Sequence, residues 1–123
     1  MRIQVIHSYD YRPEAIFYGD GPRYFGVELE IDKGGEIGSN VEQILAVENQ
    51  KHDFYYCKHD GSLDDGFEIV SNSATEEYHL TQLPWKAVMA EAVSLGYRSH
   101  QACTCGLHIH ISRLAFGRTA AQQ

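Results

Sequence analysis

The stretch YFGVELEI, residues 24–31, alternates between aliphatic residues and small or acidic ones. Its aliphatic positions are Val27, Leu29 and Ile31, and the positions between them are Gly26, Glu28 and Glu30. A period of two is typical of a β-strand that turns one face toward a hydrophobic core. The stretch therefore predicts a strand whose second face is acidic.

A helix is expected directly after this strand. Gly34 and Gly35 end the alternation, and Ser39 followed three residues later by Glu42 has the spacing of a capping box. The helix that this box would open is expected to reach about Gln50. Its inward-facing residues would be Val41, Ile44 and Leu45.

Two short strands around a turn are expected in the middle of the chain. Residues 54–57 (FYYC) are aromatic and strand-prone, and residues 67–70 (FEIV) form a second such run. Asp60 and Gly61 between them are a turn signal, so we expect the two strands to pair antiparallel. Glu68 would then be an acidic residue between apolar neighbours, where a carboxylate is unfavourable unless it has a partner.

A second helix and a last strand follow. Thr81 is expected to cap a helix that has Pro84 in its first turn and ends before Gly96. The predicted core stripe of this helix is Trp85, Val88, Met89, Ala92 and Leu95. Residues 107–112 alternate again, which predicts a strand with an imidazole face. Its aliphatic face is Leu107, Ile109 and Ile111, and its polar face is His108, His110 and Ser112.

The composition favours one small domain over residues 1–123. A chain of 123 residues with 43% hydrophobic residues has enough apolar side chains for a core. The order of short strands and helices predicts an α+β fold with a mainly antiparallel sheet and helices on one face. Residues 1–22 would form a lead-in, punctuated as loop over residues 10–22, and residues 23–112 the sheet and helices.

Charge and cysteine content limit the partners and the compartment. Seventeen acidic against ten basic side chains give a net charge of −7, which argues against nucleic-acid binding. No apolar run approaches the roughly 20 residues of a membrane span, so no membrane partner is expected. Three cysteines cannot all pair with one another, so we expect reduced thiols and a cytoplasmic protein.

The polar faces of three predicted strands carry side chains of the metal-ligand type. Glu28 and Glu30 would lie about 7 Å apart on one strand face, and paired carboxylates suit Mg²⁺ or Mn²⁺. Taken alone, this pair is better explained as a solvated strand face, because Glu-x-Glu is common in half-exposed strands. Glu68, His108 and His110 repeat the pattern on two other strands, which favours a shared site for cations and phosphate.

Three motifs together resemble the phage and bacterial amidoligase family. They are YFGVELEI (24–31), KHDGSLDDGFEIVS (58–71) and CGLHIHIS (105–112). The likeness extends to HSYDYRP (7–13) and PWKAVMAEAVSLGYRSH (84–100), so it covers nearly the whole chain. This family belongs to the glutamine-synthetase-like carboxylate–amine ligases.

The resemblance implies an ATP-dependent ligase reaction with Mg²⁺ or Mn²⁺. In that reaction a substrate carboxylate attacks the γ-phosphate of ATP, and an amine captures the resulting acyl phosphate to form an amide. The expected substrates are a small-molecule or peptide carboxylate and an amine. The expected fold is part of a glutamine-synthetase-like catalytic domain.

The resemblance also implies roles for individual residues. Metal ligands would be Glu28, Glu30, Glu68 and His110, and the residues that serve the nucleotide would be His108, His110 and Ser112. Asp60 and Ser62 would act in catalysis together with His108, in a loop that touches the incoming amine, although an ordinary turn explains Asp60-Gly61-Ser62 as well.

The chain departs from this family in length, because family members usually continue well beyond Gln123. We therefore expect a C-terminally truncated fragment in which Arg98, Arg113 and Arg118 are the nearby cations, without the arginines that would clamp the γ-phosphate. We also expect an unpaired sheet edge and self-association through that edge.

Three other interpretations remain open. One is a truncated, non-catalytic remnant that binds nucleotide or metal. Another is a small zinc-binding module, although strand alternation places its cysteines opposite its histidines; its ligands would be Cys103, Cys105, His108 and His110. A third is a cysteine hydrolase that uses Cys105 with His108.

Overall fold

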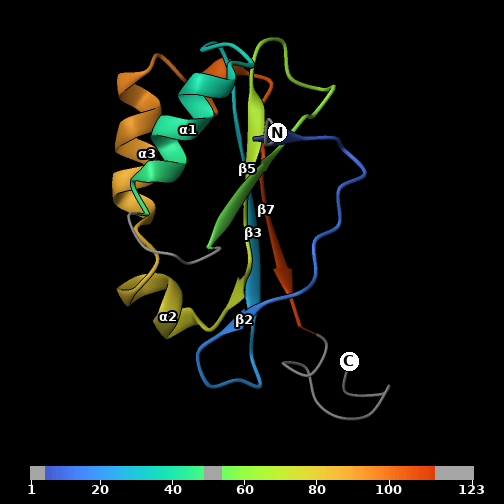
Figure 1. The fold of residues 1–123 in the computed structure, drawn as a ribbon, viewed down its shortest axis with the longest axis vertical. Helices are drawn as coiled ribbons and strands as arrows, with labels where there is room; N and C mark the ends of the chain where they lie inside the picture. The colour runs from blue at the N-terminus through green and yellow to red at the C-terminus, as the bar shows by residue number, and fades with distance from the viewer. Residues whose placement is uncertain (1–4, 49–53, 113–123) are drawn as a thin grey trace, which may run out of the picture.

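The computed structural model describes residues 5–48 and 54–112, and the expected helix end at Gln50 lies outside them. Its fold is α+β, as predicted: the described residues form one seven-stranded sheet with the α-helices on one side (Figure 1). The segment that joins β1 (Ile6–His7) to β2 (Phe17–Tyr18) runs along the other side (Figure 1).

Strand β3 (Phe25–Ile31) is the centre of the sheet. It pairs antiparallel with β7 (Leu107–Ile111) on one side and with β5 (Phe67–Ser71) and β6 (Ser73–Ala74) on the other. β5 pairs antiparallel with β4 (Tyr55–Lys58), so the turn-linked strand pair is confirmed. The β1–β4 and β2–β6 pairs are parallel, so the sheet is mixed.

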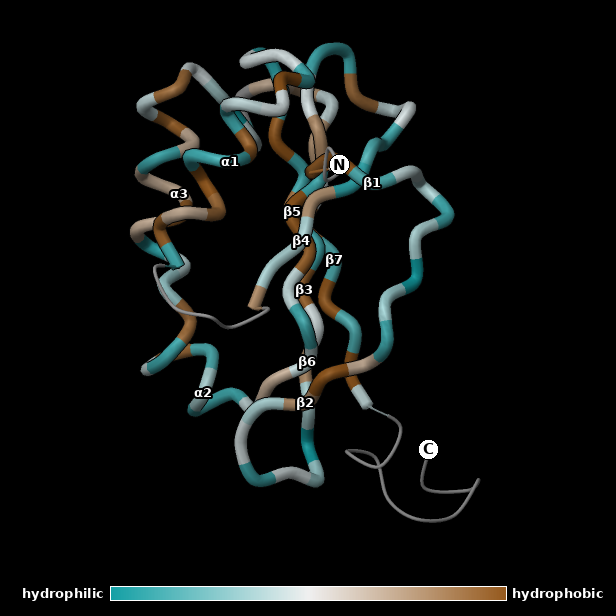
Figure 2. The backbone as a smooth tube through the Cα atoms, in the orientation of Figure 1, coloured by the Kyte–Doolittle hydropathy of each residue, from teal (hydrophilic) through white to brown (hydrophobic). Residues whose placement is uncertain are grey.

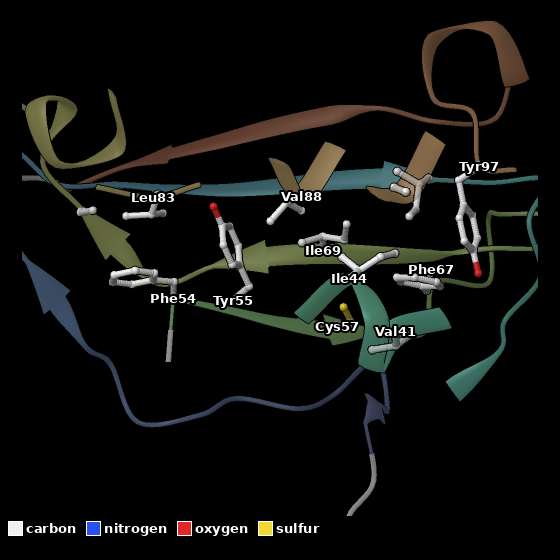
Figure 3. Packing of buried hydrophobic residues seen from close by; sticks show 13 residues of the cluster. Val41, Ile44, Phe54, Tyr55, Cys57, Phe67, Ile69, Leu83, Val88 and Tyr97 are labelled. Atoms are coloured by element: carbon white, nitrogen blue, oxygen red, sulfur yellow. The ribbon is translucent and has the colours of Figure 1, made fainter. Parts of the chain in front are cut away.

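The predicted alternation of β3 is what separates the core from the polar face. Hydrophobic and hydrophilic segments alternate along β3 and β7 (Figure 2). The core lies between the sheet and helices α1 (Gly38–Ala46) and α3 (Trp85–Ser94) (Figure 3). Its most deeply buried side chains include Val41, Ile44, Phe67, Ile69, Val88 and Tyr97.

Helix α1 begins two residues earlier than the predicted capping box allows. Its N-cap is Ile37, whose extended backbone accepts hydrogen bonds from the amides of Asn40 and Val41, and no side chain caps it. Ser39 already lies inside the helix, so the capping box with Glu42 is wrong. Burial of Val41 and Ile44 determines where this helix sits, and those inward positions are confirmed.

The expected helix start at Thr81 is also wrong. Thr81 is the last residue of a separate helix, α2 (Glu76–Thr81), and its hydroxyl donates to the carbonyl of Glu77. Thr75 caps α2 by accepting a hydrogen bond from the amide of Tyr78. Both threonines precede plausible first turns, and the glutamates after Thr75 suit the positive end of a helix.

Met89 does not belong to the core, unlike the rest of the predicted stripe on α3. Val88 and Ala92 are buried, and Trp85 and Leu95 are partly buried against the core, but Met89 is 44% exposed. It lines an apolar groove between α3 and the sheet, because in the described part of the chain no helix covers the aliphatic face of β7. No helix among the described residues is long and apolar enough to cross a membrane.

Candidate metal site

Strand register brings acidic side chains together on the face of the sheet that points away from the helices. Glu30 of β3 pairs with Glu68 of β5, and Glu68 in turn pairs with Lys58 of β4. Two positions along β3, Glu28 pairs with His108 of β7. Directly paired residues project to the same face, so these five side chains share one surface.

Glu30, Asp60 and Glu68 form what we call the acidic cluster. Each offers a carboxylate oxygen, and these oxygens all lie within 4.8 Å of one another. Asp60 comes from the loop between β4 and β5, where the amide of Ser62 (2.9 Å) and its hydroxyl (2.7 Å) both donate to Oδ1 of Asp60. The amide of Gly106 donates to Oε2 of Glu30 at 2.7 Å. The cluster is therefore held by two strands, a loop and a backbone donor.

Within the acidic cluster, the carboxyl group of Glu68 is balanced between its protonated and ionised forms near neutral pH. Burial raises the pKa of Glu68 to about 7, and the charges of Glu28 and Asp60 act in the same direction while Lys58 opposes them. Burial also raises the pKa of Glu30, against the hydrogen bond from Gly106. The cluster can therefore exchange a proton for a cation near pH 7.

Asp60 is the member of the acidic cluster that stays ionised. Burial acts to raise its pKa, but the hydrogen bonds from Ser62 and those shared with Glu68 and Glu30 outweigh it and set the pKa below the usual value. Its carboxyl group contacts both glutamates, so a proton or a cation must lie between these oxygens. Asp60 was predicted as a catalytic residue of the loop, and the structure places it among the expected metal ligands.

Glu28 contacts different partners, although it lies on the same face as Glu30 as predicted. Its Oε2 is 3.3 Å from Nε2 of His110 and 3.5 Å from Nδ1 of His108. We call these three residues the Glu28–histidine group. Both imidazoles are more than half exposed, so this group is open to a solute. The predicted single space shared by Glu28 and Glu30 is thus divided between two adjacent groups.

A polar cleft of about 240 Å³ opens beside the Glu28–histidine group. One wall is the segment of residues 12–16, with Arg12 at its start, and the other includes Glu28, Tyr56 and His110. Arg12, whose side chain is exposed, and His110 are the lining residues that can carry positive charge, and the carboxylate of Glu28 lines the cleft beside them. The cleft therefore offers a guanidinium and an imidazole as hydrogen-bonding groups next to a carboxylate.

Two other predicted site residues, Ser112 and Ser62, make hydrogen bonds within the chain. The hydroxyl of Ser112 donates to the carbonyl of Pro22 and accepts from the amide of Tyr24, which ties the end of β7 to the chain before β3. Ser62 holds Asp60, as described above. Their proposed roles toward nucleotide and amine stay predictions.

Lys58 is the residue of this face that the sequence reasoning missed. It is only 5% exposed, pairs with Glu68, and its Nζ lies 5.4 Å from the centre of the Tyr9 ring. The predicted strand ended at Cys57, one residue too early. Extending the alternation by one position would have placed Lys58 beside Tyr56 on the polar face.

The cysteines do not come together with other metal-ligand side chains among the described residues. Within residues 5–48 and 54–112 the acidic cluster alone brings three ligand atoms within 4.8 Å, so Cys103 and Cys105 do not converge with the histidines there. All three cysteines are free thiols. Burial raises the pKa of Cys105, which disfavours the thiolate that a hydrolase would need.

Comparison with known proteins found no relative of this chain. No protein-family model, curated protein or solved structure matches the chain. The chemistry of the site is therefore inferred from the acidic cluster, the Glu28–histidine group and the cleft beside them.

Proposed function

We propose that the acidic cluster binds a divalent cation, Mg²⁺ or Mn²⁺, and that this cation takes part in an ATP-dependent carboxylate–amine ligase reaction. The observation that carries the proposal is the convergence of three carboxylates from two strands and a loop within 4.8 Å. Hard oxygen donors at this spacing suit both cations. The contacts of Asp60 with Glu30 and Glu68 fit a bound cation, because otherwise protons must neutralise them.

The chain's own residues divide the work of such a reaction. Glu30, Asp60 and Glu68 would hold the cation, which when bound supplies positive charge against the phosphates of ATP. The imidazole of His110 and the guanidinium of Arg12, which both line the cleft, and the imidazole of His108 next to Glu28 would donate hydrogen bonds to those phosphates. These donors would orient the nucleotide without a covalent intermediate on the protein.

Asp60 is also the carboxylate that an amine substrate could reach. It is the member of the acidic cluster that lies in a loop, and it is half-buried where Glu30 and Glu68 are buried. An ionised carboxylate there can hold an ammonium group or accept its proton before amide formation. Ser62 fixes the orientation of this carboxylate through two hydrogen bonds.

Calorimetric titration with Mn²⁺ tests the metal site. We expect one Mn²⁺ per chain, and at least about tenfold weaker binding in Glu68→Gln and in Glu30→Gln, because each variant removes an anionic ligand. Glu42→Gln is the matched control, since Glu42 is exposed on α1 away from this face. Unchanged Mn²⁺ binding in the double variant Glu30→Gln/Glu68→Gln would disprove the site.

The ligase reaction needs a second experiment. In the presence of Mn²⁺, ATP and a panel of carboxylates, hydroxylamine would trap an acyl phosphate as a hydroxamate with release of phosphate. We expect hydroxamate with at least one carboxylate, and none in Glu68→Gln. Mn²⁺ binding that ATP leaves unchanged, without phosphate release, would refute the ligase and retain only a metal-binding protein.

A further inference from the structure

Strand β7 is an open edge of the sheet. Among the described residues it pairs only with β3, and Figure 3 shows it at the border of the sheet beyond β3. All five of its residues are exposed, including Leu107 at 58%, Ile109 at 56% and Ile111 at 43%. An exposed edge with aliphatic side chains is a template for another strand.

The backbone N–H and C=O groups of β7 that do not bond to β3 belong to its three aliphatic residues. The amide of Glu30 donates to the carbonyl of Gly106, and the amide of Ser112 donates to the carbonyl of Tyr24. In an antiparallel ladder, residues whose N–H and C=O groups bond to the neighbouring strand alternate with residues whose groups point away from it. The even-numbered residues of β7 therefore bond to β3. The N–H and C=O groups of Leu107, Ile109 and Ile111 therefore point to the open edge.

The strand also has none of the features that block pairing between edges. Its sequence, LHIHI, contains no proline, glycine, lysine or carboxylate, in a chain whose net charge is −7. The pattern is nearly symmetric about its centre, Ile109, with a histidine and then an aliphatic residue on each side. A strand with this symmetry complements a second copy of itself.

We propose that β7 pairs antiparallel with β7 of a second copy, centred on Ile109. In this register Ile109 pairs with the partner's Ile109, and Leu107 pairs with the partner's Ile111, so every outward N–H and C=O group at these positions finds an acceptor or donor. The aliphatic side chains pack as cross-strand pairs on one face.

The partner would also contribute to the polar face. In the same register His108 lies opposite the partner's His110, on the face that carries Glu28. The Glu28–histidine groups of the two copies would then form one continuous row across the two-fold axis. This pairing does not depend on the metal site and goes beyond the proposed ligase reaction.

Disulfide trapping tests the register. In a Cys103→Ser/Cys105→Ser background, Ile109→Cys places two thiols at the central pair, where Cα atoms are about 5.5 Å apart and a disulfide forms without movement. Leu107→Cys is the matched control, because the two copies of position 107 lie four residues apart along the strands, at about 13 Å. We expect a covalent dimer from Ile109→Cys alone. Equal cross-linking of both variants, or none of Ile109→Cys, would overturn the register.

Sedimentation equilibrium tests the dimer itself. Ile109→Lys places like charges opposite each other at the centre, and we expect it to weaken the dimer at least about tenfold. Leu80→Lys is the control, since Leu80 is the most exposed aliphatic side chain of the apolar groove but lies on α2, away from the edge. Circular dichroism melts and Mn²⁺ binding show that Ile109→Lys is folded. A monomeric wild type, or a dimer that Leu80→Lys disrupts and Ile109→Lys does not, would refute the proposal.

Discussion

Asp32 is a fully buried carboxylate just after β3, at the point where the sheet meets the loop between β4 and β5. It accepts hydrogen bonds from the amides of Lys33, Asp64 and Asp65 and from the hydroxyl of Thr104. Burial alone would raise its pKa, but these four donors, with Thr104 first, lower the pKa to about 2. Asp32 thus anchors the end of the loop that also presents Asp60.

Asp32→Asn is expected to destabilise the protein by about 2–4 kcal/mol, because the amide retains one acceptor oxygen and leaves buried donors unpaired. Urea denaturation at pH 7 measures the change. Asp10→Asn serves as the control, since Asp10 is exposed in the segment after β1. A difference below about 0.5 kcal/mol, the usual size of a surface substitution, would show that the loop is anchored by other contacts.

The sequence allowed three of the candidate site residues to be assigned to one face. Alternation fixes the face of Glu28 and Glu30 on β3, and an acidic residue between Phe67 and Ile69 stands out by its chemistry alone. Asp60 could not be placed in the cluster from the sequence, because its position depends on the register between β4 and β5 and on its hydrogen bonds to Ser62.

At the scale of elements, α2 shows which threonine starts a helix. Thr75 accepts a hydrogen bond from the amide of Tyr78, whereas Thr81 ends the same helix and is exposed. Thr75→Ala is expected to cost about 1 kcal/mol of unfolding free energy through loss of the cap. Thr81→Ala, the matched control, is expected to stay within about 0.5 kcal/mol of the wild type. Thermal denaturation of both variants decides, and the reverse order would restore the sequence-based assignment of Thr81.

The elements that the sequence predicted well are those whose pattern repeats over several residues. The alternating strands β3 and β7, and β5, which was predicted as a strand-prone run, are found within one residue of the expected bounds. Helix ends were missed because Ser39 and Thr81 have suitable side chains for a cap but the wrong backbone position. The exposure of Met89 depends on which strand packs against α3, and the local sequence pattern does not reveal that strand.

For the whole molecule, the buried carboxylates set a narrow range of highest stability in the absence of metal. The folded-state pKa of Glu68 is about 7 against an ordinary 4.5, so its burial costs stability that grows as pH rises between these values. The folded-state pKa of Asp32 is about 2 against an ordinary 3.8, so its contribution is lost as pH falls below 3.8. Maximum stability is therefore expected between these two ranges, near pH 4–5.

With EDTA present, the unfolding free energy is expected to fall by about 1–3 kcal/mol from pH 5 to pH 8, since one unit of pKa corresponds to about 1.4 kcal/mol. Denaturant titrations at each pH measure this fall. Glu68→Gln should flatten it. Mn²⁺ in place of EDTA, at about one hundred times the wild-type Kd, should add about 2.7 kcal/mol at pH 8 to the wild type and at most about 1.4 kcal/mol to Glu68→Gln, which binds at least about tenfold more weakly. Stability that rises over this range in EDTA would contradict the proposed balance.

β3 serves the core with one face and the candidate site with the other, and it is paired along both of its edges. A single inserted or deleted residue in this strand would exchange the two faces, so that Glu28 or Glu30 would enter the aliphatic layer and Leu29 would face the cleft. Length changes in β3 are therefore tolerable only two residues at a time. Over evolutionary time the strand would preserve its length in even steps, while the loop after Lys58 could vary its residues more freely around Asp60.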